Sequence, residues 1–418
     1  MTVNSVAQKR SAIKPETLVI GIDIAKHTHV ARARFYDGSY TKPVKVPNNR
    51  TGFLALTEQI GAWKSRPDSP VIVGVESTGS YGVNLVRWLA ECGCRVVLVP
   101  SLHVCREKEL LDNSRGTSDD KDALIIADLV ARGQYLGFVT LSGACLELRP
   151  LVGLRARLVR ERTGWLNALH QTVDVLFPEF ETVFADLSRP SVRLVLGRFG
   201  TAAAARAYYP TEMRRLLVAD GAVRVSLAKL ERLQAAAAES IGPLEVSAGQ
   251  KRSLREMLAT LAALEERIAG IEEEIERLLE QLPEACYLTS VKGIGAMTAG
   301  VIMSETGGLA QYSCAAAVLK LAGLNLYQVS SGQYHSGRHI SKRGRSQLRR
   351  ALYMVAVQHA KRGWPLHPYY AALVARGKPK NVALTAVCCR LVRLLYALVR
   401  DGRCYSECPP DVGRPQAA

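Results

Sequence analysis

Two short apolar runs, each followed by a carboxylate, constrain the fold of this 418-residue chain most strongly. Leu18 to Ile22 precedes Asp23 in LVIGIDIAKHTH, and Val71 to Val75 precedes Glu76 in VIVGVESTGSYG. Each run is typical of a buried strand, where a charge at the end is costly unless it has a partner such as a metal ion. We therefore expect both strands in one sheet, with their carboxylates meeting at one edge.

The segment from residue 17 to residue 135 alternates predicted strands with predicted helices. The predicted strands are Leu18 to Asp23, Val30 to Tyr36, Thr41 to Val46, Val71 to Val75 and Arg95 to Val99, and the predicted helices are Gly52 to Trp63, Val83 to Glu91 and Ser118 to Arg132. Three meandering strands followed by crossover helices and further strands is the ribonuclease H order. An α/β domain of that topology is therefore predicted.

Two further carboxylates, Asp119 and Asp122, lie in GTSDDKDALIIADL. They are three residues apart at the start of an amphipathic helix, so their side chains project from one face. With Asp23 and Glu76 they could hold two divalent ions roughly 3.5–4 Å apart at a phosphodiester. Asp23 alone would be read equally well as a turn or cap residue, but the four together favour a two-metal site and a nucleic-acid substrate.

The charge distribution supports a polyanionic partner independently. Between Thr306 and Arg400 there is no Asp or Glu, while Lys and Arg number 15, so this tract supplies most of the formal net charge of +17. Such a tract suits nucleic acid, which is held by phosphate neutralisation and counterion release.

A chain of 418 residues is long enough for two or three domains, and 48% hydrophobic and 22% charged residues are ordinary for a soluble globular protein. Residues 1–16 have no apolar segment typical of a signal peptide and are predicted to be a flexible, cytosolic leader. The apolar runs are judged too short to span a bilayer. The ten cysteines lack the spacing of a zinc site and are interpreted as buried thiols.

An unbroken heptad pattern marks the middle of the chain. Its apolar positions are Leu254, Met257, Leu261, Leu264, Ile268, Ile271, Ile275, Leu278 and Leu282. The pattern predicts a coiled coil that ends at Pro283. Its partner is either a second chain or the basic helix of residues 148–178 in the same chain, and the sequence leaves both open.

The C-terminal part carries a turn and a basic loop that could contact phosphate. Gly293 and Gly295 resemble the hairpin of helix-hairpin-helix modules, although a tight inter-helix turn fits them equally well. The loop contains Ser330, Ser331 and Ser336. The candidate nucleic-acid-binding residues around it are Arg338, Lys342, Arg343, Arg345, Arg349 and Arg350. His27, His29, His335 and His339 are expected to contact phosphate or to pack, rather than to bind metal.

The order of these motifs resembles the DEDD transposases of bacterial insertion elements, the group related to the Piv invertase that includes the bridge-RNA-guided recombinases. The motifs are GIDIAK, VESTGSYG, D-x-x-DA, GIGAMTAGVIMSE, GLNLYQVSSG and ISKRGRSQLRRALY, within residues 17–140 and 284–400. The resemblance implies a RuvC-like domain whose tetrad, Asp23, Glu76, Asp119 and Asp122, holds Mg²⁺, with two ions expected. It also implies that Ser331 forms a covalent phosphoserine with DNA.

The same resemblance implies recombination of double-stranded DNA through a Holliday-type junction, guidance by a non-coding bridge RNA, and a homo-oligomer, dimer or tetramer. Its active sites would combine the RuvC-like domain of one protomer with the serine of another. A cytoplasmic, nucleoid-associated bacterial protein with no membrane partner is expected.

The expected domains follow from these motifs. They are a leader (1–16), a RuvC-like catalytic domain (17–147), a helical insertion with the coiled coil (148–283), a mostly helical transposase domain (284–402) and a tail (403–418). The function of residues 179–243, which have no counterpart in the shorter family members, is left open.

Three departures from the family pattern stand beside the resemblance. Thr117 and Ser118 replace the usual Lys-Thr before the third acid, Asn325 and Leu326 replace the usual Pro, and Ser330 competes with Ser331 as nucleophile. The alternative functions are a RuvC-like junction nuclease that uses water, an actin-like sugar kinase, and a DNA or RNA binder without activity. The kinase is disfavoured because Ala25 replaces a glycine of its phosphate loop.

Overall fold

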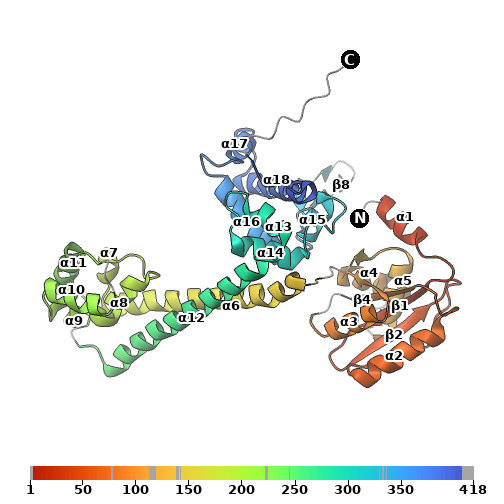
Figure 1. Cartoon of the computed structure of the whole chain (residues 1–418), viewed down its shortest axis with the longest axis horizontal. Coiled ribbons are helices and arrows are strands. Elements are labelled where there is room, and N and C mark those ends of the chain that lie inside the picture. Colours follow the sequence, from red (N-terminus) through yellow and green to blue (C-terminus); the bar gives the residue numbers. More distant parts are fainter. Residues whose placement is uncertain are drawn as a thin grey trace, which may run out of the picture. The chain divides into compact units, whose positions relative to one another are not determined.

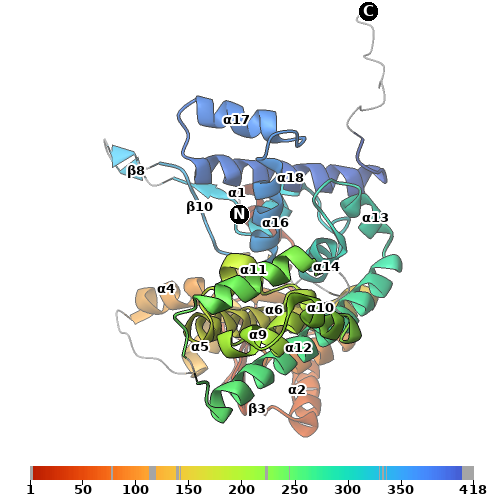
Figure 2. The same ribbon diagram turned by 90° about the vertical axis from the view of Figure 1, so that its left-hand side faces the viewer.

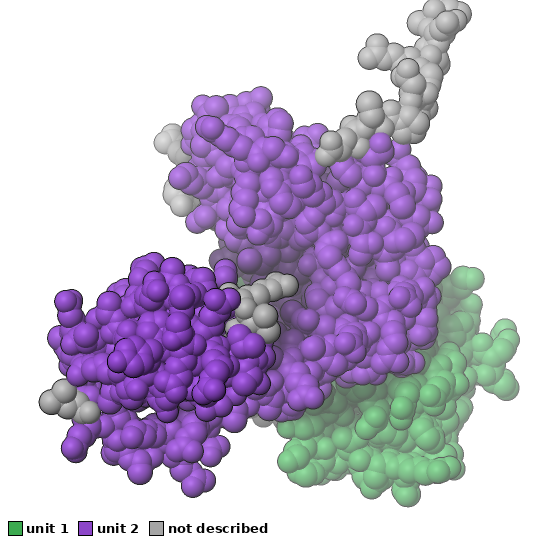
Figure 3. Space-filling model, turned by 60° about the vertical axis from the view of Figure 1, so that its left-hand side comes forward, with its two compact units in different colours: residues 1–140 green, residues 141–418 purple. Residues whose placement is uncertain are grey.

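The computed structural model describes residues 3–76, 79–112, 119–137, 141, 143–221, 225–243, 245–328, 330–331, 334–335 and 337–406. The chain divides into two compact units, residues 1–140 and residues 141–418, which Figure 3 colours separately. The sequence placed the end of the catalytic domain at residue 147, inside the first helix of unit 2.

Unit 1 is built on a mixed sheet of six strands in the order β3-β2-β1-β4-β5-β6. The strands are β1 (Leu18–Asp23), β2 (Thr28–Arg34), β3 (Val44–Pro47), β4 (Val71–Glu76), β5 (Arg95–Val99) and β6 (Leu136–Gly137). β1, β2 and β3 are paired antiparallel as a meander, whereas β4 joins β1 and β5 joins β4 in parallel. The predicted meander followed by parallel crossover strands is therefore confirmed.

Helices cover both faces of this sheet (Figure 1). They are α2 (Arg50–Trp63), α3 (Val83–Glu91), α4 (Ser101–Asp112) and α5 (Asp119–Ala131). Because side chains alternate along a strand, Ile20 and Ile22 join the core beneath α2 and α3. Val19 joins the opposite core with α4 and α5. The acidic edge lies on the α5 side, as described below.

The N-terminal segment contains helix α1 (Val3–Ser11), where the sequence predicted a flexible leader. Lys9 Nζ donates to the carbonyl oxygen of Tyr135 at 2.6 Å and lies 4.8 Å from the centre of its ring. Gly133, in the left-handed region, leaves room for α1, because a Cβ there would lie 2.7 Å from the carbonyl oxygen of Val6.

Unit 2 is organised by two long helices, α6 (Gly143–Leu176) and α12 (Ala248–Glu280), that pack side by side. The heptad residues of α12 face α6 of the same chain: Leu264 and Ile268 pack against Leu158, and Arg155 Nε donates to Glu272 Oε1 at 2.7 Å. α6 therefore fills the heptad face, which agrees with the intramolecular reading of the coiled coil.

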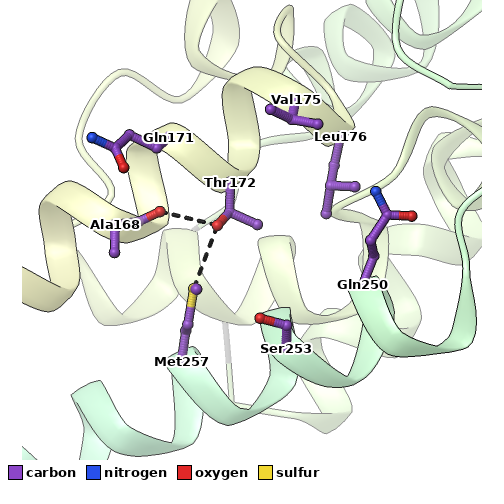
Figure 4. A pocket seen from close by; sticks show the side chains of 8 residues that line it. All are labelled: Ala168, Gln171, Thr172, Val175, Leu176, Gln250, Ser253 and Met257. Carbon is purple, nitrogen blue, oxygen red and sulfur yellow. Dashed lines mark hydrogen bonds between the residues drawn. The ribbon is translucent and has the colours of Figure 1, made fainter.

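A small cleft between α6 and α12 has a volume of about 330 Å³ (Figure 4). Thr172 Oγ1 donates to the carbonyl oxygen of Ala168 and approaches Met257 Sδ at 3.5 Å. The lining residues are Ala168, Gln171, Thr172, Val175, Leu176, Gln250, Ser253 and Met257. None of them is charged, so the cleft lacks the groups that phosphoryl transfer requires.

A helical bundle connects α6 to α12, and its hydrophobic core includes Leu169 and Leu176 of α6 and Leu254 and Leu261 of α12. Its helices are α7 (Phe180–Val183), α8 (Pro190–Phe199), α9 (Ala202–Arg206), α10 (Pro210–Ala219) and α11 (Leu227–Ala238). We call these elements the tip bundle. Phe180 and Phe199 are among its fully buried side chains.

The remaining elements of unit 2 form the C-terminal domain, which shares a core with the adjoining ends of α6 and α12. Its helices are α13 (Pro283–Thr289), α14 (Ala296–Thr306), α15 (Ala315–Leu321), α16 (Ser346–His359), α17 (His367–Ala375) and α18 (Lys380–Asp401). Its short strands are β7 (Leu326–Tyr327), β8 (Ser330–Ser331), β9 (Tyr334–His335) and β10 (His339–Ile340). α18 is long and apolar enough to cross a membrane, contrary to the expectation from the sequence, but Leu391 and Leu395 on it pack in this core.

Among the described cysteines only Cys145 and Cys388 are buried, so the expectation of mostly buried thiols was wrong. Burial raises the pKa of the Cys388 thiol to about 12. Cys408 lies outside the described residues.

Candidate active site

Two glycines bring helix α5 directly onto the sheet. Gly21 of β1 and Gly74 of β4 are paired in register. A Cβ on Gly21 would lie 2.0 Å from the carbonyl oxygen of Ala123, and a Cβ on Gly74 would lie 2.5 Å from Cγ2 of Val130. Only glycine allows so close an approach, and the sequence signal for it was a glycine two residues before each strand-end acid.

The same glycines determine the face on which the strand-end acids lie. Asp23 follows Gly21 by two residues, and Glu76 follows Gly74 by two, so each acid shares its glycine's face of the sheet. Ile22 pairs with Val75, which places Asp23 and Glu76 next to each other at the end of two parallel strands. The predicted meeting of these two acids at one edge is therefore confirmed for their strand positions.

Helix α5 begins at Asp119, and its first turn contains Asp122. Because Ala123 and Ala127 contact β1 at Gly21, the start of α5 is held near the strand ends that carry the other two acids. The side chain of Asp119 lies outside the described residues. Among the described side chains, no three His, Cys, Asp or Glu stand close enough to hold a metal ion.

Asp122 has the most informative side chain of this edge. Lys108 Nζ of α4 donates to Asp122 Oδ2 at 2.6 Å. Asp122 Oδ1 is buried and has no hydrogen-bond partner within the described part of the chain. A buried carboxylate oxygen without a partner is costly, and a divalent cation is one group that would satisfy it. The donor set is therefore of the kind that a hard cation prefers.

Two of the candidate histidines, His29 of unit 1 and His339 of unit 2, serve packing. His29 is buried, stacks on Phe53 and accepts a hydrogen bond at Nδ1 from the Ala25 amide at 3.2 Å. Burial lowers the pKa of His29, so it stays neutral. His339 packs beside the ring of Tyr327. The packing interpretation is thus supported for both, whereas His335's side chain lies outside the described residues.

Ser331 lies in an extension of the C-terminal domain made of the short strand pairs β7 with β10 and β8 with β9, and we call these four strands the serine arm. At its base Tyr327 pairs with His339. Further out, Ser331 pairs with Tyr334, so it is the last paired residue of β8. Figure 2 shows β8 projecting away from α16 and α18. The side chains of Ser330 and Ser331 lie outside the described residues, as does Ser336 altogether.

The base of the serine arm is closed by tight backbone contacts. A Cβ on Gly344 would lie 2.3 Å from the carbonyl oxygen of Leu321, and Lys342 adopts a φ of 52°. Lys342 is the one described residue other than glycine in that left-handed region, where side chains are disfavoured. Arg349 Nη1 donates to the carbonyl oxygens of Ala322 and Lys342, at 2.8 and 3.3 Å. Arg349, predicted to bind nucleic acid, therefore holds the two sides of the base together.

The other candidate cations differ in their availability. Arg345 Nη1 lies 3.2 Å from Glu305 Oε2, so this arginine is partly neutralised. Arg338, Lys342, Arg343 and Arg350 are exposed and have no side-chain partner in the described part of the chain. These four remain available for a polyanion.

In the turn from Gly293 to Gly295, the first glycine packs against Trp364, whereas the second has free space beside it. Gly293 has a φ of 89°, and a Cβ there would lie 2.9 Å from the ring of Trp364. Gly295 is the N-cap of α14, and a Cβ there would meet nothing within 4 Å. Gly293 therefore serves the tight inter-helix turn, while the amides at the start of α14 have open space beside Gly295.

Comparison with known proteins now decides the family. Residues 20–178 match the DEDD transposase family of IS110, described as "Transposase", and residues 285–371 match "Transposase IS116/IS110/IS902 family". The chain belongs to the IS110/IS116 family of DEDD transposases. It is therefore a DNA transposase, and this family is generally metal-dependent.

Several relatives align with most of this transposase. The "Insertion element IS110 uncharacterized 43.6 kDa protein" of Streptomyces coelicolor is 28% identical, over 94% of this chain and 96% of its own. The "Insertion element IS116 uncharacterized 44.8 kDa protein" of Streptomyces clavuligerus is also 28% identical, over 94% of this chain and 96% of its own. The "Probable family 20 transposase" of Pseudomonas aeruginosa is 25% identical, over 80% of this chain and 86% of its own.

Proposed function

We propose that this transposase cuts and rejoins double-stranded DNA with the tetrad Asp23, Glu76, Asp119 and Asp122 and the hydroxyl of Ser331. The observation that carries the proposal is the register of Gly21 with Gly74 beneath α5, which draws the four acidic positions toward one edge. The strand order of unit 1 supports a RuvC-like ribonuclease H fold.

The four carboxylates would hold two Mg²⁺ ions, and the partnerless Oδ1 of Asp122 supports a cation at this edge. When bound, such ions would stabilise negative charge on the attacking and departing oxygens of a phosphodiester. Without a bound cation the clustered carboxylates would repel the phosphate, so the task of the acids is to hold the ions in place. Their placement on two strand ends and one helix start gives a rigid frame for this task.

In the proposed cleavage step, Ser331 Oγ bonds to phosphorus while the bond from phosphorus to one deoxyribose oxygen breaks. The serine proton passes to a tetrad carboxylate or to water, and the departing deoxyribose oxygen takes up a proton. Attack by a deoxyribose hydroxyl of the second strand on the phosphoserine reverses these changes and frees Ser331. A serine hydroxyl is a poor nucleophile on its own, so the step requires the tetrad and the arm in one site.

We further propose a homo-oligomer, dimer or tetramer, in which the serine arm of one protomer meets the tetrad of another. A non-coding bridge RNA would guide target choice, and DNA recombination would take place in the bacterial cytoplasm at the nucleoid. The exposed Arg338, Lys342, Arg343 and Arg350 support contact with a polyanion. Sequencing the RNA that co-purifies with the protein tests guidance, and light scattering tests the oligomer.

The tetrad is tested by single changes that keep side-chain size. We expect Asp23→Asn, Glu76→Gln, Asp119→Asn and Asp122→Asn each to abolish strand cleavage and to leave DNA binding largely intact, because the acids lie outside the basic tract. Binding is measured by fluorescence anisotropy on the same DNA. Robust cleavage by any two of these variants would contradict a two-metal site.

The nucleophile is tested by trapping the covalent product. Incubation with a nicked cognate DNA, digestion and mass spectrometry should give a nucleotide-modified peptide that contains Ser331. Ser331→Ala and Asp122→Asn should each prevent the adduct. An adduct on Ser330 would move the nucleophile by one residue, whereas normal recombination by Ser331→Ala with no adduct would favour a nuclease that uses water.

A further inference from the structure

The ion pair between Lys108 and Asp122 stands at the acidic edge and has no role in the function proposed above. The side chains are 19% and 13% exposed, so solvent screens the pair only in part. Lys108 comes from α4, which begins directly after β5, and Val99 at the end of β5 pairs with Glu76. The packing of α4 on α5 then brings the ammonium group to Asp122 at this edge.

Only one of the two carboxylate oxygens of Asp122 has a hydrogen-bond partner in this pair. Oδ2 accepts the Lys108 ammonium at 2.6 Å, whereas Oδ1 is buried without a partner in the described residues. Lysine is a compact point charge on a flexible stem, so it can neutralise one oxygen and still withdraw. An arginine fork would occupy both oxygens and block the site.

The charges of the carboxylates and of Lys108 determine how this ion pair affects metal binding. Several carboxylates near one another repel, and each gains from a cation within a few ångströms. In the absence of a metal ion Lys108 is such a cation. A divalent ion that binds Asp122 must either displace the ammonium group or tolerate its repulsion, and both weaken the binding of that ion.

We propose that Lys108 is a tethered counter-cation that holds Asp122 in the metal-free enzyme and competes with the metal ion for it. The proposal rests on the function proposed above, because it requires a metal ion at this edge. Lys108 is thus a positioning residue that sets the metal concentration at which the site fills.

The neighbouring residue provides a matched control. Glu107, also on α4, pairs with Arg132, which directly follows the far end of α5 and also lies 3.6 Å from Asp128 of that helix. Arg132→Met therefore removes the ion pair to α4, together with the weaker one to Asp128, without changing the charge beside Asp122. A contribution that comes only from fastening α4 to α5 would make the two variants behave alike.

The test is calorimetric titration of the full-length protein with Mn²⁺, without DNA, at fixed pH and ionic strength. Lys108→Met should lower the Kd by about tenfold, because a charge in direct contact shifts an ionic equilibrium at a carboxylate by roughly that factor or more. Lys108→Arg, which keeps the charge, and Arg132→Met should not tighten binding. In an Asp122→Asn background, Lys108→Met should have no further effect.

The outcomes separate the two proposals. If the wild type binds Mn²⁺ and Lys108→Met binds it equally well or more weakly, the proposed role of Lys108 is wrong. The acidic metal site is then still supported. No Mn²⁺ binding by folded wild type and by all variants overturns the acidic site together with this inference. Circular dichroism confirms folding, and Lys108→Gln replaces Lys108→Met if the latter does not fold.

Discussion

Adding one methyl group at Gly21 should separate the acids of the strands from those of α5. In Gly21→Ala the new Cβ would lie 2.0 Å from the Ala123 carbonyl oxygen and 2.5 Å from the Ala127 amide nitrogen. Both are backbone atoms, so no side chain can turn away. The helix would have to retreat by roughly 1.4 Å before the closer contact reached the ordinary 3.4 Å.

This displacement predicts two measurable effects. Overpacking of this kind lowers the free energy of unfolding by about 1–3 kcal/mol. A shift of about 1 Å in catalytic groups costs on the order of 100-fold in rate, because α5 carries Asp119 and Asp122 away from Asp23 and Glu76. Urea unfolding and strand cleavage on a cognate DNA measure the two effects separately.

Gly61→Ala is the matched control, since a Cβ at this exposed position of α2 would meet nothing within 4 Å. It should leave cleavage unchanged and stabilise the helix by up to about 1 kcal/mol. DNA binding by Gly21→Ala should match wild type, because the basic tract belongs to unit 2. Wild-type cleavage by a folded Gly21→Ala would refute the argument that this contact assembles the site.

The arm and the C-terminal core give further predictions. Replacing both Arg343 and Arg350 by Ala should flatten the dependence of log K for DNA on log salt by roughly 0.9 per lost phosphate contact, measured by anisotropy; an unchanged slope would remove them from the interface. Arg349→Ala should leave this slope unchanged but lower the free energy of unfolding by about 1–2 kcal/mol, because two carbonyl oxygens lose a charged donor. Burial lowers the pKa of His359 below 6.5, so the unfolded state binds its proton more readily and stability should fall as pH drops through and below 6.5. Urea midpoints at pH 8 and pH 5.5 should differ less in His359→Gln than in wild type, and an equal difference would assign the pH dependence elsewhere.

The sequence predicted the parts of the site that depend on local pattern. Apolar runs ending in Asp23 and Glu76 indicated two strands of one sheet with their acids at one edge, and the heptad indicated a coiled coil. The glycine before each acid is a signal for a close approach to the sheet, but it does not tell that α5 makes this approach, because that depends on which helix crosses which strand. The partner of the heptad was undetermined for the same reason.

Charge in the sequence was a weaker guide to individual residues. Arg349 and Arg350 are adjacent and were assigned the same role, yet Arg349 bonds backbone carbonyl oxygens while Arg350 is exposed. Lys108 could not be predicted as a residue of this edge, because only the packing of α4 on α5 brings it to its partner Asp122. The approach of Ser331 to the tetrad stays a prediction, since it depends on how domains or protomers assemble.

The tip bundle is a segment in the middle of this transposase where the sequence can vary. The two family matches end at residue 178 and resume at residue 285, so the bundle falls between them. The chain leaves α6 and returns to α12 at neighbouring points, because a Cβ on Gly242 would lie 2.6 Å from the carbonyl oxygen of Leu176. The bundle shares its core with the adjoining ends of α6 and α12, so a longer or exchanged bundle must still cover the apolar face that contains Leu176 and Leu254. New recognition elements can therefore be grafted here, provided that this face stays covered, while the catalytic parts keep their sequence.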